Sequence, residues 1–239
     1  MDNVVYLKLP RPRLDLVARA SRIAVSDLYE ALPADLRDQV LMNSRIRPLL
    51  PGTRVAGPAV TARCAPNDNL MMHKALLLAQ RGDVLVIDGG EPSGAQWGYL
   101  AAVYASKKEL AGVVIEGCIR DADALVAHRS AVWFREISPA HPTKKGPGAV
   151  NVPVRCGEVL VHPGDLVCAD GDGVLMVPQR YLESTILAAE ARAQNETMAV
   201  KAIEAGQSLF EIHGLGSAFE ASETEVIDAA WAEEHGKSP

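Results

Sequence analysis

Long hydrophobic runs are missing from this chain of 239 residues, and no apolar stretch approaches the length that spans a membrane. The N-terminus, MDNVVYLKLPRPR, carries an acid at its second position and lacks the apolar core of a secretion signal. We therefore expect a cytoplasmic protein that has no membrane partner.

Clusters of lysine and arginine are also missing, and the formal net charge is −6 at pH 7. Proteins bind nucleic acids through such clusters, which displace counterions from the phosphate backbone. The composition therefore argues against direct binding to a nucleic acid.

Cysteine is scarce and scattered, at Cys64, Cys118, Cys156 and Cys168. Zinc knuckles and redox-active dithiols need two cysteines at a short spacing, which this chain does not provide. We predict that the four thiols are free and buried as small hydrophobic side chains.

Several catalytic motifs are absent as well. The chain has no Walker sequence, no G-x-G-x-x-G, no G-x-S-x-G and no H-E-x-x-H, so nucleotide-binding, serine hydrolase and zinc protease functions lack their minimal parts. A Schiff-base aldolase needs a buried lysine of lowered pKa, whereas the lysines here mostly have charged neighbours, as in Lys107-Lys108. That class stays open but has no support in the sequence.

Hydrophobic residues make up 48% of the chain and charged residues 23%, which is enough for one sizeable core. We predict an α/β protein with a single compact domain over residues 1–239. An N-terminal arm at residues 1–20 and a C-terminal tail at residues 207–239 would flank its core. The arm is expected to pack late or to contact a neighbour.

Residues 82–123 carry the pattern of a βαβ unit. A short β-branched run at residues 84–87 is followed by Gly, Pro and Ser and then by an Ala-rich segment of helical character. Gly112 stands where a helix C-cap is expected, and residues 113–115 form a second β-branched run.

Parallel strands joined by a right-handed crossover end at the same edge of a sheet, so the loops after Asp88 and Glu116 should emerge side by side. The first loop leads to a helix N-terminus near residues 96–101, where free backbone N–H groups favour an anion. The second brings Arg120 and Asp121 to that edge. Such a site can hold an organic anion and a hard metal ion, although the dipeptide alone is more typical of an exposed ion pair.

The rest of the sequence predicts further helices and strands. Ser26 is expected to cap a short helix. The turn at residues 66–69 should start a helix over residues 70–80, with Asn69 as its cap and His73 packed rather than acting as a ligand. Further strands are predicted at residues 54–62, 131–137, 149–154 and 158–161, and a long surface helix at residues 181–205.

Asp170-Gly171-Asp172-Gly173 is similar to the start of a calcium-binding loop. The carboxylate that such a loop needs at its twelfth position would fall on Tyr181, so the comparison fails. We predict a tight hairpin turn between two strands instead.

Spaced residues of the central unit resemble the family of class II pyruvate aldolases that act on 4-hydroxy-4-methyl-2-oxoglutarate and 4-carboxy-4-hydroxy-2-oxoadipate. The same family includes the regulator of ribonuclease E activity A. The residues that carry the likeness are Gly89-Gly90, Ala95, Trp97-Gly98, Gly112, Val114-Ile115, Gly117 and Arg120-Asp121. The likeness extends from about residue 26 to about residue 206. It implies a swivelling, phosphohistidine-domain-like α/β fold with mixed sheets, and a homotrimer or hexamer whose sites lie between subunits.

The resemblance implies a metal-dependent lyase for a small 2-oxo acid. Asp121 would bind Mg²⁺ or Mn²⁺, which prefer oxygen ligands and keep waters. The substrate carboxylate would lie on the amides of Leu100 and Ala101, and Arg120 would bind the carbonyl or enolate oxygen. Gly98, Tyr99 and Asn69 would also face the substrate. Glu196 would reach the water shell of the metal in an adjacent subunit.

One position departs from the family. Its aldolases commonly have an acid directly after the glycine that is Gly98 here, and this chain has Tyr99. A tyrosine with a pKa near 10 is a poor base at neutral pH, so proton transfer needs another group, for which Glu116 is the candidate. Two hypotheses therefore remain: a 2-oxo acid lyase that is an aldolase or a decarboxylase, and a non-catalytic regulator that binds a ribonuclease or another protein.

Overall fold

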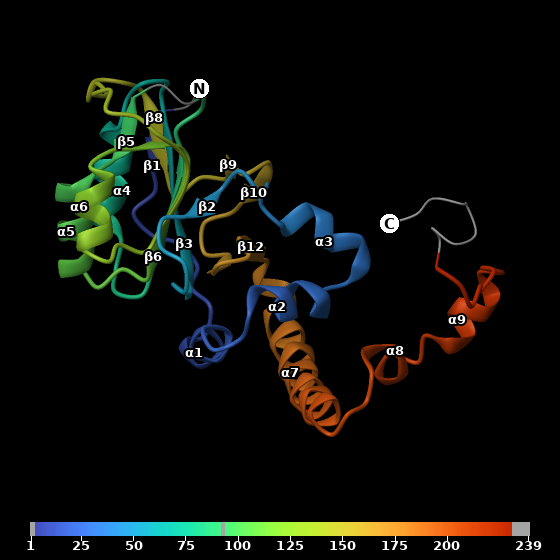
Figure 1. The fold of residues 1–239 in the computed structure, drawn as a ribbon. Coiled ribbons are helices and arrows are strands. Elements are labelled where there is room, and N and C mark those ends of the chain that lie inside the picture. The colour runs from blue at the N-terminus through green and yellow to red at the C-terminus, as the bar shows by residue number, and fades with distance from the viewer. Residues whose placement is uncertain (1–2, 92–93, 231–239) are drawn as a thin grey trace. The chain divides into compact units, whose positions relative to one another are not determined.

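The computed structural model describes residues 3–91 and 94–230 (Figure 1). Contacts divide the chain into two units, residues 1–193 and residues 194–239. In the described part, no helix is both long and apolar enough to cross a membrane.

The first unit is built on a mixed sheet. In its described residues the strand order is β1-β8-β3-β4-β6-β7-β2, with β11 and then β12 beside β3, and β5 beside β6. Strands β9 and β10 form a separate antiparallel pair. The strands are β1 (Val4–Val5), β2 (Arg47–Pro48), β3 (Val55–Cys64), β4 (Val84–Asp88), β5 (Ala95–Trp97), β6 (Gly112–Ile119), β7 (Val132–Ile137), β8 (Gly148–Val150), β9 (Val154–Cys156), β10 (Val159–Val161), β11 (Leu166–Ala169) and β12 (Val174–Val177).

Helices cover both faces of this sheet. In the first unit they are α1 (Leu14–Ala20), α2 (Val25–Ala31), α3 (Ala34–Val40), α4 (Leu70–Leu78), α5 (Tyr99–Lys107), α6 (Ala122–Ala127), the 3₁₀ turn η1 (Gln179–Tyr181) and the first turns of α7 (Leu182–Glu204). The second unit contains α8 (Leu209–Ile212) and α9 (Gly216–Ala221).

Side chains of β4 alternate between the two cores, as the pleat of a strand requires. Val84 and Val86 belong to one core together with side chains of α1, α2, α3 and the start of α7. Leu85 and Ile87 belong to the other core together with α4, α5 and α6, which lie on one side of the sheet in Figure 1. The α/β class, the mixed sheet and the long C-terminal helix are confirmed.

The predicted βαβ unit is present as β4, α5 and β6. Strands β4 and β6 are parallel, with Asp88 opposite Glu116. Two details differ from the prediction. A short strand, β5, precedes the helix, and Gly112 begins β6 rather than capping α5, because the helix already ends at Lys107 and Glu109 makes the left-handed turn at φ 56°.

Residues of the predicted N-terminal arm pack against the rest of the first unit. Strand β1 pairs with β8, and Leu16 and Ala20 of α1 are buried in the first core. Arg11 forms an ion pair with Asp83, whose side chain is fully buried, and its Nη2 donates to Asp83 Oδ2 at 2.9 Å.

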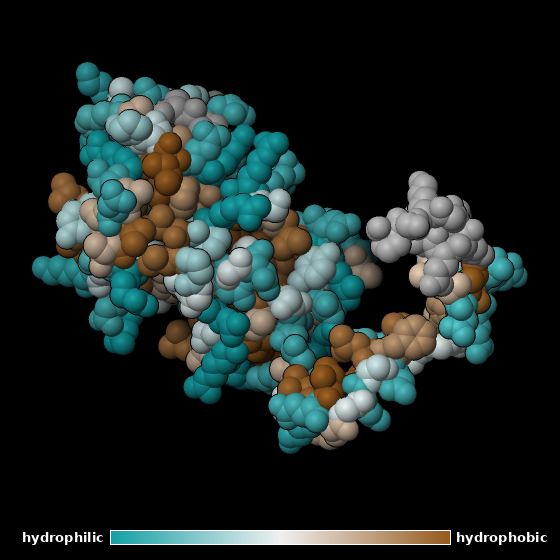
Figure 2. All heavy atoms as spheres, in the orientation of Figure 1, coloured by the Kyte–Doolittle hydropathy of each residue, from teal (hydrophilic) through white to brown (hydrophobic). Residues whose placement is uncertain are grey.

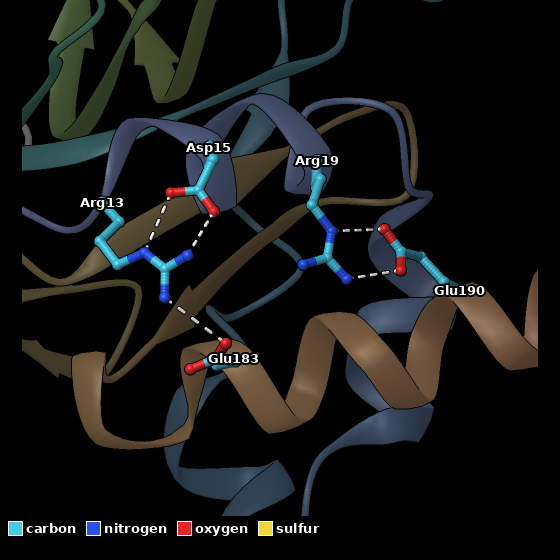
Figure 3. A network of polar contacts seen from close by, with 5 residues as sticks. All are labelled: Arg13, Asp15, Arg19, Glu183 and Glu190. Carbon is cyan, nitrogen blue, oxygen red and sulfur yellow. Dashed lines mark hydrogen bonds and ion pairs between the residues drawn. The ribbon is translucent and has the colours of Figure 1, made fainter.

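Polar contacts join α1 to the first turns of α7 (Figure 3). Arg19 donates through two nitrogens to the carboxylate of Glu190, at 2.8 and 2.6 Å. Arg13 lies between Asp15 and Glu183, with the longer ion pair at 3.5 Å. These pairs are partly exposed to solvent, so we expect them to contribute little stability compared with the buried side chains of α7.

The cap predicted at the start of α2 is made by another residue. Ser26 lies inside the first turn of α2, and Asp170 Oδ2 instead accepts the Val25 N–H at 3.0 Å. The other oxygen of Asp170 accepts the Asp172 N–H at 3.0 Å, inside the turn between the antiparallel strands β11 and β12. The predicted hairpin turn is confirmed, and both oxygens of the Asp170 carboxylate accept hydrogen bonds from backbone N–H groups.

Residues 149–154 do not form one strand. Asn151 takes a left-handed conformation, with φ 56°, and separates β8 from β9. The long C-terminal helix agrees with the prediction to within one residue at each end, as α7.

The second unit contains the end of α7 and the short helices α8 and α9. None of its described residues, 194–230, is buried. Helix α8 begins at a capping box in which Ser208 and Glu211 bond each other's backbone N–H groups. The division therefore falls inside α7, earlier than the tail predicted from residue 207.

None of the four cysteines forms a disulfide and all four are buried, as predicted. Burial raises the pKa of Cys64 and of Cys168 to about 12, and also raises the pKa of Cys156. Thiolates are the reactive form, so we expect a disulfide reagent at pH 8 to label none of them in the folded protein and all four after unfolding in urea. Rapid labelling of the folded chain would contradict the buried positions.

Candidate active site

A cavity of about 130 Å³ lies where β5 and β6 end and α5 begins. Most of the residues predicted from the sequence line it: Asn69, Gly98, Leu100, Ala101, Arg120 and Asp121. The volume suits a small organic acid rather than a nucleotide or a sugar chain.

Parallel pairing of β5 with β6 explains how the two loops meet. Trp97 is opposite Ile119 in the register, and the Arg120 N–H donates to the Trp97 carbonyl at 2.9 Å. Gly98 and Arg120 therefore leave the sheet next to each other, one into α5 and the other into α6.

The Asp121 carboxylate lies on the N-terminus of α5. Its Oδ2 accepts the Tyr99 N–H at 3.0 Å. The first intrahelical bond of α5 is made by Ala102, which donates to the Gly98 carbonyl, so the amides of Leu100 and Ala101 have no acceptor within the helix. The start of α5 thus offers free donors and a positive dipole end beside a carboxylate.

Asp121 also has an unusual backbone. Its φ of 58° and ψ of 38° lie in the left-handed region, where it stands as the N-cap residue of α6. Aspartate tolerates this region better than most residues, and such conformations cluster at functional sites. The turn aims the side chain back at α5 instead of along α6.

Arg120 lies beside this carboxylate without a hydrogen bond to it. Its Nε is 3.7 Å from Asp121 Oδ2, and the two side chains are 38% and 42% exposed. The pair is therefore open to solvent on one side and lines the cavity on the other. Its guanidinium remains able to donate to an oxyanion.

Gly98 has no room for a side chain. A Cβ at this position would lie 2.7 Å from Asp121 Oδ2 and 3.0 Å from Arg120 Cγ. We expect Gly98→Ala to displace both side chains and to lower turnover at least tenfold, while urea unfolding shifts little because the displaced groups are partly exposed. Gly171→Ala, where nothing lies within 4 Å, is the matched control. Full activity in Gly98→Ala would show that the present arrangement is not required.

Tyr99 contributes its amide and not its ring. The ring packs edge-on against His128 of α6, with centroids 5.7 Å apart, and the side chain is not part of the cavity wall. The phenol therefore does not stand in for the acid that the resemblance places after Gly98.

Glu116 does not join the predicted site, which corrects its proposed catalytic role. It lines a different cavity, of about 350 Å³, where Oε1 accepts Arg135 Nη1 at 2.7 Å and Oε2 accepts the Gly157 N–H at 2.6 Å. Neighbouring residues of a strand point to opposite faces, and Ile115 belongs to the core beneath α4, α5 and α6. Glu116 therefore points to the other face.

Asn69 precedes α4 but does not cap it through its side chain. Asp68 Oδ1 accepts the Leu70 N–H at 2.8 Å, while Asn69 Nδ2 donates to the Gln96 carbonyl at 3.3 Å. Asn69 Oδ1 and Gln96 Nε2 are buried without a hydrogen-bond partner, and both residues line the cavity. Unpaired buried polar atoms are rare, so Asn69 Oδ1 is available to accept a hydrogen bond from a ligand or water in the cavity.

Three basic side chains of the cavity wall were not assigned to the site from the sequence. They are His73, His141 and Lys144. Burial, with a smaller effect of the Lys144 charge, lowers the pKa of His73, so this imidazole is neutral at pH 7. His73 lies one helical turn after Asn69, which is a signal the sequence did contain, whereas Lys144 comes from a loop far away in the chain.

A metal would have few protein ligands here. Within residues 3–91 and 94–230, no group of three or more His, Cys, Asp or Glu side chains could hold a metal ion. Asp121 supplies one carboxylate to the cavity, which fits a hard ion that keeps most of its waters and does not fit zinc. Glu196 is an exposed residue of α7, and its role toward a neighbouring subunit stays a prediction.

Comparison with known proteins gives the family. A family model described as RraA-like, Aldolase/RraA, matches residues 25–176. The chain belongs to the RraA-like family. The resemblance of the central unit is thereby confirmed.

Relatives of this RraA-like chain have names of two kinds. A protein of Halalkalibacterium halodurans, provisionally named a 4-hydroxy-4-methyl-2-oxoglutarate aldolase, is 36% identical over 68% of this chain and 78% of its own length. Streptomyces coelicolor RraAS2, described as an unusual member of the RNase ES inhibitor RraA family, has a TM-score of 0.71 and 30% identity, covering 80% of this chain and 98% of its own. The family thus includes proteins named for an aldolase and proteins named for an inhibitor.

A third relative shows how much of the fold is shared. The structure of an uncharacterized protein from Pseudomonas syringae pv. tomato has a TM-score of 0.74 and 25% identity, and covers 85% of this chain and 99% of its own. Almost all of that structure is therefore matched, while part of the present chain lies outside the shared fold.

Proposed function

We propose that this RraA-like protein is a lyase that cleaves a C–C bond of a 4-hydroxy-2-oxo acid and releases pyruvate, and that it also decarboxylates oxaloacetate. The observation that supports this most directly is the placement of Asp121 on the first amide of α5, beside Arg120, at a cavity of about 130 Å³. The aldolase names among the relatives agree with it.

The start of α5 is suited to the substrate carboxylate. Leu100 and Ala101 line the cavity, and their amides have no acceptor within the helix. The positive end of the helix dipole adds to the attraction of this end of α5 for an anion. The adjacent keto oxygen would then face Arg120. His73 and Lys144 line the same cavity, within which the rest of the 2-oxo acid would lie.

Arg120 would stabilise the charge that develops during cleavage. In the retro-aldol reaction the C4 hydroxyl loses its proton and C4 becomes a carbonyl, while the C3–C4 bond breaks and its electron pair forms the C2–C3 double bond of an enolate whose negative charge lies on the former keto oxygen. Protonation of this enolate at C3 then gives pyruvate. Loss of CO₂ from oxaloacetate leaves the same enolate. A guanidinium donor at that oxygen is of the kind that changes rates by about 10² to 10³ in other enzymes.

A divalent ion would add Lewis-acid polarisation of the keto oxygen, and Asp121 is the side chain that would hold Mg²⁺ or Mn²⁺. The proton of the C4 hydroxyl needs a base in the cavity. Tyr99 and Glu116 point elsewhere, and the neutral imidazole of His73 takes that role in this proposal. Glu196 of a neighbouring subunit would complete the site in a homotrimer or hexamer.

The test is a screen of the purified protein against oxaloacetate, 4-hydroxy-4-methyl-2-oxoglutarate and 4-carboxy-4-hydroxy-2-oxoadipate. Pyruvate is followed with lactate dehydrogenase and NADH, with Mg²⁺ and with EDTA, and the rate of each mixture without protein is subtracted. We expect Mg²⁺-dependent pyruvate release from at least one substrate. No release from any of them would remove the proposal.

The alternative is a non-catalytic regulator that binds a ribonuclease. Two observations favour it: this chain has Tyr99 where the resemblance expects an acid, and the Streptomyces relative is described as a member of an inhibitor family. Inhibition of ribonuclease E cleavage by the purified chain, together with no turnover in the screen, would support this function over the lyase.

A further inference from the structure

A third cavity, of about 170 Å³, is bounded by α5, by the turn after α6 and by the first residues of β6 and β7. We call it the α5 cavity. Among the described residues, Trp97 is the one that lines both this cavity and the candidate active site. An apolar cavity of about 150 Å³ inside a protein is large enough to bind benzene, so the α5 cavity has room for a molecule of that size.

The two helices beside the cavity end in the same type of cap. The Leu110 N–H donates to the Ala105 carbonyl at 3.1 Å, and the Ser130 N–H donates to the Leu125 carbonyl at 3.0 Å. The residue before each donor has a positive φ, of 56° and 54°. These are Schellman motifs, which satisfy the last carbonyls of α5 and α6. Hydrogen bonding to a molecule in the cavity therefore falls to side chains.

Two side chains of the cavity wall have polar atoms without a partner. Trp97 Nε1 and Ser130 Oγ are buried and make no hydrogen bond to a described residue, and the two residues are 1% and 7% exposed. By contrast, the indole of Trp133 donates to the Asp170 carbonyl at 2.9 Å. Buried polar groups without a partner are rare, and an indole N–H can only donate. The wall is therefore able to bind an oxygen atom.

The rest of the buried wall is apolar and uncharged. Arg129 is the charged residue of the wall within the described part of the chain, and it is exposed. Because an unpaired ion is costly to bury, the interior suits a neutral molecule. Hydrophobic residues also reach the surface in the part of the molecule that contains α4, α5 and α6 (Figure 2), where Val103 and Tyr104 are exposed. The buried apolar side chains of the wall include Ala102, Ala105, Val113 and Val132.

We propose that the α5 cavity is a second binding site, separate from the candidate active site, for a small neutral molecule that has an apolar body and one oxygen, as a phenol does. The Trp97 N–H and the Ser130 hydroxyl bind the oxygen, and the alanine and valine side chains pack against the body. Burial of apolar surface drives the binding, and the two polar groups select the chemical class. This site does not depend on the proposed lyase function.

Phenol is the probe, benzene is the matched molecule without the oxygen, and benzoate is the charged one. The indole N–H signals of Trp97 and Trp133 are followed by ¹⁵N NMR during each titration. We expect phenol to shift the Trp97 signal saturably and to leave the Trp133 signal in place, because Trp133 belongs to the core on the other face of the sheet. Benzene should bind about fivefold more weakly, for loss of the hydrogen bonds, and benzoate about tenfold more weakly.

Two substitutions in the wall test the position of the phenol. Ser130→Ala removes a hydroxyl that has no described partner, so the fold should be kept and the affinity for phenol should fall about fivefold. Ala105→Leu fills the cavity and should abolish binding of phenol and benzene alike. Ala127→Leu, at an exposed position of α6 that does not line the cavity, is the matched control and should leave both affinities unchanged.

The same titrations give the results that would overturn the proposal. Neither Ser130 nor Ala105 lines the candidate active site, so unchanged affinity for phenol in both variants would place the phenol elsewhere. Equal shifts of the Trp97 and Trp133 signals, or no saturable shift before phenol unfolds the protein, would mean that the cavity holds water alone. Benzoate binding as tightly as phenol would overturn the assignment to a neutral ligand.

Discussion

Replacing Asp121 with asparagine is expected to lower pyruvate release at least about a hundredfold, the scale on which single charge-stabilising groups act in active sites. The amide oxygen of asparagine can still accept the Tyr99 N–H, which the carboxylate now accepts at 3.0 Å, so the start of α5 should keep its structure. What disappears is the negative charge, and with it the proposed ligand of the divalent ion. The rate is measured at several Mg²⁺ concentrations with the preferred substrate of the screen.

Asp123→Asn is the matched control. It removes the same charge two residues further on, from an exposed position of α6 that does not line the cavity. We expect its rate to stay within about twofold of the unmodified protein. Equal losses in the two variants would mean that the general charge of this region matters, and not the carboxylate on α5.

Replacing Arg11 with methionine is expected to lower the free energy of unfolding by about 2 kcal/mol. Asp83 has a fully buried side chain, and the change would leave its carboxylate with the Gln80 N–H, at 2.7 Å, as its remaining described donor. Removing one partner of a buried pair costs about 3–5 kcal/mol, and the partial exposure of Arg11 reduces this figure. Urea unfolding followed by circular dichroism gives the value.

A second substitution identifies the cause. Arg11→Met combined with Asp83→Asn removes the unpaired charge but keeps an acceptor for Gln80, so most of the lost stability should return. Arg13→Met, at a side chain that is 64% exposed, should change stability little. If the double variant were less stable than Arg11→Met alone, the loss would come from packing of the arginine stem and not from the buried charge.

Local patterns in the sequence were sufficient for the central unit. The β-branched runs at residues 84–87 and 113–115 are too short for helices, and the segment between them is rich in alanine, so strand, helix and strand followed from side-chain chemistry alone. The handedness of the crossover then placed Arg120 and Asp121 at the edge where α5 begins. The structure has them there, at the cavity that Leu100 and Ala101 also line.

Some local predictions were wrong because contacts with residues distant in the sequence determine the structure there. Ser26 has the chemistry of a cap, but Asp170 reaches the start of α2 from the other end of the chain. The N-terminal residues have no strong pattern of their own, and Asp83 and β8 hold them in place. A cap or an arm is therefore predictable from local preferences only when no tertiary contact competes.

The sequence by itself determined the class of the fold, the family and the pair Arg120-Asp121, because these depend on periodicity, short motifs and the fixed hand of a crossover. The tertiary structure alone decided which groups face the cavity. It turned the ring of Tyr99 onto His128, sent Glu116 to the opposite face of the sheet, and brought His73 and Lys144 to the cavity wall. The direction of a side chain depends on the pleat of its strand, on bulges and on the packing around it. These features arise from contacts between residues distant in the sequence, so local sequence patterns do not specify them.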